Sequence, residues 1–378
     1  MKKIVLGIFA ACMMMVPMFA DRNITIRTAE ADKPWTGSVP DDVAAIFYEN
    51  QSEIESALYS AGATYKNVDD YMQVIINAYK GLGNPYTTAI NGLNGFSDDL
   101  KDTIPNTQIQ QNVWANSWIG YLVQIGNGLH CPRFGLGANL GVATVDTESI
   151  KKTGEAFKTD MGSIPSVLPM PTITFDARVG GVKVGDFALP FDFGFTLCTI
   201  DSSKIGLDKM MDKLNFDFFS IGFDVRYCVW EHHVLDTKVS VGAGFYYTKG
   251  SLGVDADAAD IGLDFKSTNF TLNGQISTKL LFFRPFVGAR LMFTNSEVNW
   301  SAKNIDWTSI LSSALPENNP ASALLPDHFE GGADGFKFRP VLQGGFAFDF
   351  AVIDLTFSAS YDVSSKVFGG ALSTRFSL

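Results

Sequence analysis

Polar and apolar residues alternate along several segments of ten to fifteen residues between Phe134 and Leu378. In residues 187–197 every odd position is phenylalanine or leucine, while Asp192, Gly194 and Thr196 lie between them. A period of two predicts β-strands, because successive side chains of a strand point to opposite faces. Strands of about 9–11 residues with one apolar and one polar face are typical of barrels that cross a membrane.

The pattern predicts a mainly β fold, an antiparallel transmembrane β-barrel of about ten strands. The expected strands are residues 133–145, 170–179, 184–199, 216–229, 235–247, 265–281, 285–300, 336–348, 353–361 and 367–378. Long polar segments follow the first, third, fifth and seventh strands, and the one after the fifth strand holds Asp255, Asp257 and Asp260. Tight turns follow the even-numbered strands up to the eighth, as in outer-membrane barrels. A soluble β-sandwich, the alternative, would have shorter strands and less regular loops.

Residues 21–130 carry a different pattern. A short alternating piece, residues 23–27, fits either a loop or a strand, and helical spacing of apolar residues then covers residues 41–58, 69–82, 87–104 and 108–125. Gly81, Gly83 and Pro85 are expected to end the second helix. Because amphipathic helices must bury their apolar stripe, we expect residues 21–130 to form a helical N-terminal plug or periplasmic domain before a barrel over residues 131–378.

Residues 1–20 resemble a secretory signal peptide, with Lys2 and Lys3, an apolar run over residues 4–16, and Ala20 before the expected cleavage. The alternative is a lipoprotein signal with Cys12 as the acylated residue. In either case we expect an exported chain.

Composition narrows the function classes. The formal net charge of −11 argues against a nucleic-acid partner. After the N-terminus no apolar run reaches 18 residues, so a spanning chain would have to do so as a closed barrel. Of the remaining cysteines Cys131, Cys198 and Cys228, the last two should lie too far apart for a disulfide.

The chain ends within its last predicted strand, where Phe368, Leu372, Phe376 and Leu378 share one face. This ending resembles the C-terminal signal that the barrel-insertion machinery reads in bacterial outer-membrane proteins, although Leu378 stands where that family has Phe or Trp. Residues 116–122, 133–137 and 279–285 further resemble segments of uncharacterised spirochaetal outer-membrane barrels. The resemblance implies a fold, an outer-membrane location and lipid contact, but no activity.

Charged residues at inward positions are the candidates for solute selection. They are Asp176, Arg178, Asp192, Asp224, Arg226, Lys238, Lys279, Arg290, Lys337, Arg339, Asp354 and Arg375. The same residues could instead pair with one another and close a narrow barrel, because buried charges must be matched. Inward glycines such as Gly135 and Gly137 would let a plug lie close to the wall.

Ile305, Trp307, Ile310 and Leu311 form an apolar group in the predicted external segment 301–335 and are candidates for a lid or capture site, or for a small core of the loop. The four histidines, His130, His232, His233 and His328, are expected in turns, linkers or loops, without the spaced partners that a metal or a catalytic nucleophile requires. We therefore expect neither an enzyme nor a cofactor.

The leading hypothesis is a channel or transporter for a small solute, with hydrophobic solutes among the candidates. The alternative is a closed structural or adhesin-like barrel whose external loops bind surface ligands. A soluble exported β-protein is the third possibility, and it would be recovered without detergent.

Overall fold

A computed structural model describes residues 22–28, 33–39, 44, 48, 51–60, 64, 66, 68–125, 129–156, 165–181, 183–184, 187–188, 190–201, 214–232, 236–256, 259–305, 328–350 and 352–377. The expected signal peptide, residues 1–20, lies outside them. The chain divides into two compact units. One is Met1–Ile90 with Ala156–Lys158 and Asn304–His328, and the other is Asn91–Glu155 with Thr159–Lys303 and Phe329–Leu378.

In the first unit, β1 (Arg22–Ile26) and β2 (Trp35–Val39) form an antiparallel hairpin. Ile24 and Ile26 are buried while the residue between them is exposed, so the alternating piece at residues 23–27 is a strand. α3 (Gln51–Ser60) follows. Most of the expected helix at residues 41–58 that precedes Gln51 lies outside the described residues.

The helices expected after residue 68 are one continuous helix, α4 (Val68–Gln111). Gly81, Gly83 and Pro85 do not end it, and the expected helix at residues 108–125 is wrong, because the chain leaves the helix after Gln111 and becomes β3 (Tyr121–Ile125). From Leu93 to Ile109 the apolar side chains of α4 are buried. Tertiary packing of this kind contributes more to a helix than local propensity does.

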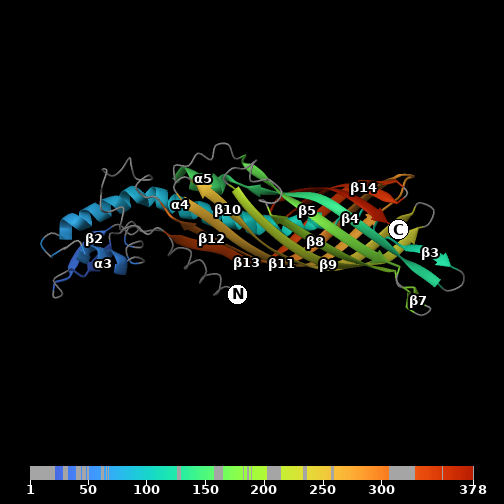
Figure 1. The fold of residues 1–378 in the computed structure, drawn as a ribbon, viewed down its shortest axis with the longest axis horizontal. Helices are drawn as coiled ribbons and strands as arrows, with labels where there is room; N and C mark the ends of the chain where they lie inside the picture. Colours follow the sequence, from blue (N-terminus) through green and yellow to red (C-terminus); the bar gives the residue numbers. More distant parts are fainter. Residues whose placement is uncertain are drawn as a thin grey trace, which may run out of the picture. The chain divides into compact units, whose positions relative to one another are not determined.

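Ten antiparallel strands form the barrel, and the expected closed ten-stranded fold is confirmed. The strands are β4 (Leu129–Asp146), β5 (Val167–Gly180), β8 (Phe191–Asp201), β9 (Leu214–His232), β10 (Thr237–Ala256), β11 (Ala259–Ser277), β12 (Phe283–Lys303), β13 (Phe329–Phe350), β14 (Ile353–Asp362) and β15 (Phe368–Ser377). Pairing of β15 with β4 from Gly369↔Ala143 to Ser377↔Gly135 closes the ring. The barrel surrounds the C-terminal part of α4 (Figure 1).

Several expected strand boundaries differ from those in the structure, two of them by many residues. The third strand begins at Phe191 rather than at residue 184, because β6 (Lys183–Val184) and β7 (Phe187–Ala188) pair as a separate small hairpin. The expected long acidic connection after the fifth strand is reduced to residues 257–258, since β10 and β11 continue to Ala256 and Ala259 and Asp255 pairs with Asp260.

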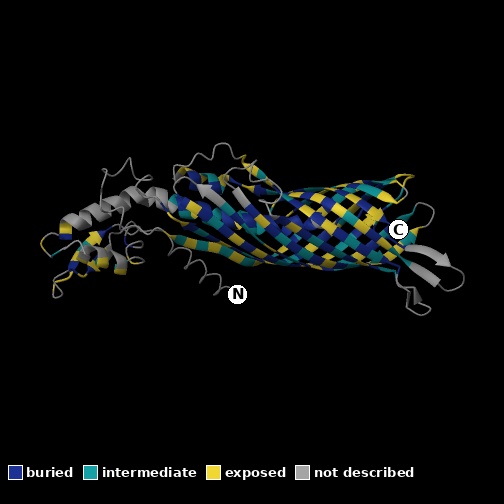
Figure 2. Cartoon of the chain, in the orientation of Figure 1, coloured by how far each residue is buried: buried dark blue, intermediate teal, exposed yellow. Residues whose placement is uncertain are grey.

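The inward and outward faces of the strands change character partway along the barrel. Towards the tight turns, outward side chains are apolar and exposed, such as Phe270 and Leu272 of β11, while inward neighbours such as Asn269 and Thr271 are buried and polar. Further along the same strand the order is reversed, with buried Leu263 facing inward and exposed Asp264 facing outward. Figure 2 shows the alternation of burial along these strands.

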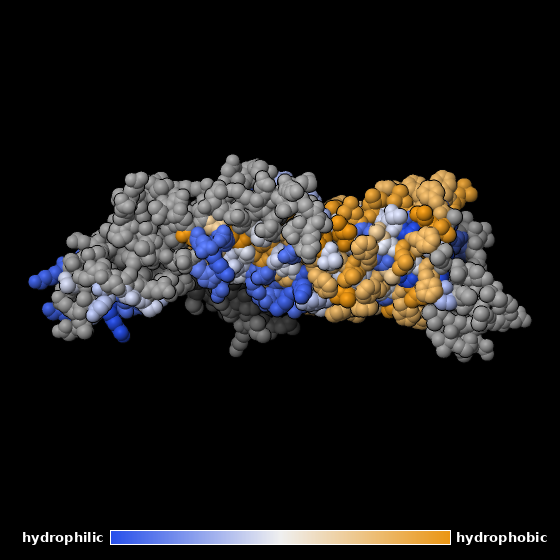
Figure 3. All heavy atoms as spheres, viewed as in Figure 1, coloured by the Kyte–Doolittle hydropathy of each residue, from blue (hydrophilic) through white to orange (hydrophobic). Residues whose placement is uncertain are grey.

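This reversal divides the barrel into two regions. The closed part contains residues 133–143, 173–180, 191–199, 219–229, 239–247, 267–277, 285–295, 336–350, 353–362 and 368–377. The extension contains residues 214–218, 249–256, 259–266, 297–303 and 329–335. Apolar atoms gather on the surface of the closed part, and hydrophilic residues lie on the visible face beyond it, where β10 and β12 end (Figure 3).

The extension is a curved sheet rather than a closed cylinder. β13 pairs with β12 from Phe329 onward but with β14 only from Val341 onward, and β8 pairs with β5 only at residues 192–198. α4 provides the hydrophobic partner of this sheet. Its Leu93, Phe96 and Leu100 are buried, as are the inward residues of the extension, Phe216, Phe218, Leu252, Ile261, Leu263, Phe265, Val298 and Trp300.

α5 (Glu148–Ala156) follows β4 and packs closely on α4. A Cβ atom added at Gly95 would lie 2.7 Å from Ser149 Oγ, and one at Gly92 would lie 2.6 Å from the Ser149 carbonyl oxygen. Glycine at these two positions therefore lets the helices approach each other. Trp300 of β12 donates a hydrogen bond to Asn94 Oδ1 at 2.8 Å, which ties α4 to the extension.

Candidate functional site: a lumen filled by its own chain

The structure places the twelve candidate charges on the lumen side of the barrel or at its rims. Nine are buried, namely Asp176, Arg178, Asp192, Asp224, Arg226, Lys238, Arg290, Arg339 and Arg375, while Lys279, Lys337 and Asp354 are partly exposed. Most of them contact residues 102–119, which occupy the lumen. The candidate site is therefore formed by this segment together with the wall.

A buried four-residue ion network lies beside the end of α4. Arg178 contacts Asp192 at 2.5 Å and Asp224 at 2.7 Å, and Arg226 contacts Asp192 at 2.8 Å. Two arginines and two aspartates balance one another, so no net charge is left in this dry region. Each guanidinium can donate to more than one oxygen, which fixes the geometry of the cluster.

Asn112, the first residue after α4, joins this network. Its Oδ1 accepts a hydrogen bond of 3.1 Å from Arg178, and its Nδ2 donates to Asp224 and, at 3.2 Å, to the Tyr246 hydroxyl. An amide has one acceptor and one donor group, so Asn112 satisfies an arginine and an aspartate at the same time. Asn112 thereby bonds the plug, which is the segment 102–119 that occupies the lumen, to three separate wall strands, β5, β9 and β10.

Trp114 lies between two cations of the wall. The guanidinium carbons of Arg375 and Arg178 lie 4.7 Å and 5.4 Å from its ring centroid. Arg375 also pairs with Asp176 at 3.1 Å. Gly135 supplies the space for this indole, because a Cβ atom there would overlap the Trp114 ring. Cation–π contacts of this kind are stronger away from water.

Residues 113–119 are neither helix nor strand, and wall side chains satisfy their backbone groups. Gln275 donates to the Trp114 carbonyl at 2.7 Å, Arg226 to the Asn116 carbonyl at 3.0 Å, and Lys238 to the Trp118 carbonyl at 3.3 Å. Ser277 Oγ accepts from the backbone of Ser117 at 3.0 Å. Buried backbone groups outside a helix or sheet would otherwise be unsatisfied, so these wall contacts allow the segment to leave the helix that the sequence pattern predicts.

Asp102 joins α4 to the wall near the other end of the lumen. It accepts from Arg339 and from Lys337, both at 2.6 Å, and Arg339 also contacts Asp362 at 3.1 Å. Asn106 donates to Asp362 at 3.0 Å. Along α4, Asp102 lies about two to three turns after Gly92 and Gly95, which face Ser149 of α5, and about three turns before Asn112.

Asp99 lies one helical turn before Thr103. The Thr103 hydroxyl donates to the carbonyl of Thr144, a residue that follows the last outward apolar residue of β4. Asp99 is outside the apolar belt and faces Asp146. Burial, and then the negative charge of Asp146, raise the pKa of Asp99 to about 6. An acid with a raised pKa prefers to be protonated in the folded chain.

Arg290 is an exception among the buried charges. It is only 3% exposed, yet no carboxylate among the described residues forms an ion pair with it. It faces the lumen from β12, and its register partners are Asn273 and Val341. Of these two buried arginines, Arg178 therefore has two carboxylate partners, and Arg290 has none among the described residues.

Several other candidates from the sequence have been located. Phe368, Leu372 and Phe376 point outward and are exposed, whereas Leu378 lies outside the described residues. Ile305 is buried, and Trp307, Ile310 and Leu311 lie outside the described residues. Tyr246 and Trp300 are buried and face inward, and Trp300 lies in the extension, where the apolar face is the inner one.

Cysteines and histidines add no chemistry to the part of the chain that the structure describes. Cys198 and Cys228 are free thiols, as expected. His130 and His232 lie within β4 and β9, so their expected place outside strands is wrong, because both strands continue further towards the turns than the alternation indicates. No group of metal-ligating residues is formed by the described positions, and none of the described helices is long and apolar enough to span a membrane.

No protein-family model and no curated protein matches this chain. Solved structures with similar folds include the translocator domain of the autotransporter NalP from Neisseria meningitidis, with 12% identity, coverage of 68% of this chain and 90% of that one, and a TM-score of 0.31. The attachment protein Ail of Yersinia pestis has 9% identity, 65% and 97% coverage and a TM-score of 0.23. The deltaS2S3 mutant of the TodX monoaromatic hydrocarbon channel has 9% identity, 65% and 89% coverage and a TM-score of 0.20.

Proposed function

We propose that this protein is an outer-membrane barrel closed by its own chain, which anchors a surface-exposed part of the molecule and does not conduct in its resting state. The observation that carries this proposal is the bonding of residues 102–119 to the wall from one end of the lumen to the other. A solute path would have to break the contacts of Asp102, Asn112 and Trp114. We therefore favour a closed surface-interaction barrel over a solute channel.

The dimensions of the closed part fit a membrane. On β4 the outward apolar residues run from Phe134 to Val142, nine positions. At about 3.4 Å per residue and a tilt of about 40°, these positions span about 23 Å along the barrel axis. The apolar band of outer-membrane barrels is about 25 Å tall.

The extension has the surface of a water-soluble protein. Its outward residues, such as Asp217, Lys266 and Asn299, are exposed and polar, and its inner face packs on α4. Such a surface is suited to water and to partners in water rather than to lipid. We infer that it projects from the outer leaflet, because short turns of outer-membrane barrels face the periplasm and longer connections face outward.

The direction of the chain through the lumen gives the proposal a topological consequence. Asn94 bonds to the extension through Trp300, and Trp118 lies against Lys238 near the tight turns, where β3 and β4 then begin. The chain thus enters the lumen from the outward rim. We infer that the polypeptide leading into Asn91 is on the cell surface, and not in the periplasm, which is one of the two locations expected from the sequence.

Conductance in a planar bilayer tests the closed barrel. We expect the refolded mature chain to insert without a steady current. A variant in which Asn112→Ala, Trp114→Ala and Asp102→Ala are combined should show current steps, because the plug then loses anchors at three levels. Steady conductance of the unmodified chain would sink the anchor proposal and restore the gated-transporter hypothesis, which the polar wall of the lumen favours as the second candidate.

Labelling of single cysteines in intact cells tests the topology. In a variant whose own cysteines are replaced by alanine, we expect Tyr59→Cys on α3 to react with a membrane-impermeant maleimide. Leu281→Cys in the tight turn between β11 and β12 is the matched control, because Leu281 is 86% exposed but faces the periplasm in our proposal. It should react only after the outer membrane is permeabilised, and the reverse order of reactivity would contradict the orientation.

A further inference from the structure

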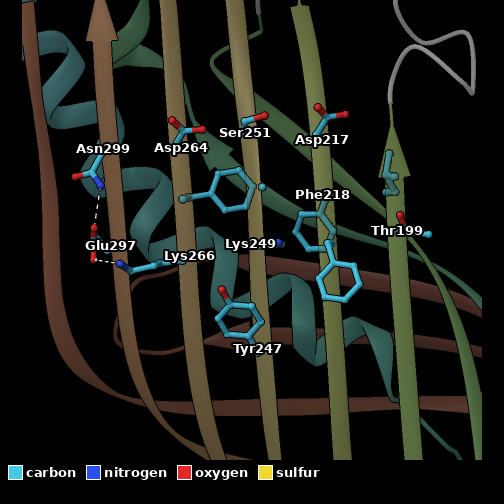
Figure 4. A pocket seen from close by; sticks show the side chains of 14 residues that line it. Thr199, Asp217, Phe218, Tyr247, Lys249, Ser251, Asp264, Lys266, Glu297 and Asn299 are labelled. Carbon is cyan, nitrogen blue, oxygen red and sulfur yellow. Dashed lines mark hydrogen bonds and ion pairs between the residues drawn. The ribbon is translucent and has the colours of Figure 1, made fainter.

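A groove of about 620 Å³ crosses β8 to β12 at the border between the closed part and the extension. Its volume lies within the range of about 300–1,000 Å³ that small-molecule sites occupy. Phe219 and Tyr247, the last outward aromatic residues of β9 and β10, lie on its side towards the apolar belt. Figure 4 shows Tyr247 at one end of the groove and Asp217, Ser251 and Asp264 at the other.

The lysines of the groove lie next to this aromatic end. The ammonium of Lys249 is 5.9 Å from the Phe219 ring centroid, and no carboxylate among the described residues bonds to it. Lys266 is the register partner of Lys249 on β11 and is bonded to Glu297 at 2.6 Å. The groove therefore presents one free and one shared positive charge just beyond the apolar belt.

Two carboxylates lie one step further from the belt. Ser251 is the register partner of Asp217 on β9 and of Asp264 on β11, so the two carboxylates flank this small side chain. Both are exposed, and neither forms an ion pair or side-chain hydrogen bond within the described part of the chain. Along the strands the order is thus aromatic, positive, negative, from the belt outward.

We propose that the groove binds the headgroup of a zwitterionic phospholipid from the outer leaflet, a proposal that rests on the proposed outer-membrane location. The phosphodiester lies against Lys249 and Lys266, and the terminal ammonium lies between Asp217 and Asp264. The acyl chains descend past Phe219 and Tyr247 onto the apolar belt. Lysine binds phosphate as a point charge, and carboxylates attract an ammonium.

The order of groups supports this ligand class. In such a lipid the phosphodiester is attached on the side of the tails and the ammonium is terminal, as are the complementary charges of the groove. An anionic lipid fits less well, since Asp217, Asp264 and Glu297 outnumber the two lysines and leave a net charge of −1 in the groove. A lipid without an ammonium would leave Asp217 and Asp264 unpaired, close to its own negatively charged phosphate.

Native mass spectrometry of the full chain in detergent tests the proposal, with phosphatidylcholine and phosphatidylglycerol of identical acyl chains as probes. We expect phosphatidylcholine to bind more tightly. Lys249→Ala should weaken it about fivefold, as expected for one exposed charge contact worth about 1 kcal/mol. The double variant Asp217→Asn, Asp264→Asn should lose the preference and bind phosphatidylglycerol at least as well.

Lys303→Ala and Asp334→Asn are matched controls, because both residues are exposed and outward on the extension but do not line the groove. They should leave the lipid preference unchanged. Equal binding of the two lipids by the unmodified chain, or equal effects of groove and control variants, would overturn the proposal. Competition by free phosphocholine at the same concentration as the lipid would also overturn it, since the tails would then contribute nothing.

The outer-membrane proposal fails by a different result, namely recovery of the chain from cells without detergent. A chain that requires detergent but shows no lipid preference would therefore reject the groove alone.

Discussion

The closed part and the extension are built from the same strands but are patterned in opposite ways. In β11, Leu272 points outward in the closed part and Leu263 points inward in the extension, only nine residues away. In the closed part the wall is apolar outside and is lined by ion pairs, whereas in the extension it is polar outside and packs Phe265 and Trp300 against α4. The distribution of polar and apolar side chains therefore follows what each face contacts, because the strand geometry is the same in both regions.

α4 shows the same division. The turns of α4 that lie against the extension contribute Leu93, Phe96 and Leu100 to an apolar core, as a helix does when it packs on a sheet of a soluble protein. Its last turns contribute Gln108 and Gln110, and Asn112 follows the helix directly. All three side chains bond to polar wall residues. One helix therefore has two kinds of partner because the wall around it changes.

Loss of one arginine from the buried network should have the largest effect on stability. Arg178→Met leaves Asp224 without an ion partner, since Asp192 retains Arg226, and should cost about 3–5 kcal/mol of unfolding free energy. Arg290→Met is the control of equal size at a site without an ion pair and should cost less than about 1 kcal/mol. Urea unfolding in lipid vesicles measures both, and similar losses would show that ion pairing does not hold the plug.

A lysine on the outer face distinguishes the two regions directly. Leu272→Lys in the closed part should destabilise the inserted barrel by about 2–4 kcal/mol, because the charge faces the hydrocarbon. Ser301→Lys on the outer face of the extension should change stability by no more than about 0.5 kcal/mol, since it faces water. The same vesicle assay applies, and equal costs would place both residues in one environment.

Truncation of one leucine should give the converse result. Leu263→Ala removes a buried side chain of the extension and should cost about 2–4 kcal/mol, transfer and cavity terms together. Leu272→Ala should cost less, because lipid fills the space that a lipid-facing side chain leaves. The ranking is read from midpoints of unfolding at equal slope, and a larger loss for Leu272 would contradict the inward core of the extension.

Acid should produce the smallest effect, through Asp99. Its folded pKa of about 6 lies above the ordinary value of 3.8, so its charge opposes folding at neutral pH, and the penalty disappears as the pH falls through 6 towards 4. Asp99→Asn should therefore stabilise the chain at pH 7.5 by about 1 kcal/mol after solvent screening is allowed for, and should have little effect near pH 4. Asp98→Asn, an exposed neighbour, is the control. A gain that does not depend on pH would show that the charge is not the cause.

Most of the closed part could be predicted from the sequence, because lipid imposes a strict alternation on every strand that it touches. The alternation predicted an apolar face that contains Phe193 and an inward face that contains Asp192 and Arg226, and the structure places Phe193 outward and both charges inward. The same rule explains the errors. The strands expected to end at Tyr247 and to begin at Phe336 continue into the extension. The expected ends were placed where outward apolar residues stop, and this is the edge of the apolar belt and not the end of the strand.

The candidate site was predictable only in part. Inward charges can be read from strand parity, but their partners cannot, because Arg178, Asp192 and Asp224 come from three strands that only the closed ring brings together. The roles of Asn112 and Trp114 could not have been found from a helical pattern, since these residues lie after the helix ends and are held there by side chains of the wall. A sign was present nonetheless, in the small inward Gly135 that faces the Trp114 indole.

By itself the sequence determined the number of strands, their faces and the closed antiparallel barrel, since period-two patterning and lipid contact are local and repeat in every strand. The filled lumen, the entry of one helix from the end that carries the extension, and the continuation of the strands as a sheet with an inward apolar face became evident only from the tertiary structure. These features depend on contacts between residues far apart in the chain, such as Asp102 with Arg339 and Asn112 with Asp224. No local pattern specifies which of two inward polar groups will meet, because that choice is made when the ring closes around the plug.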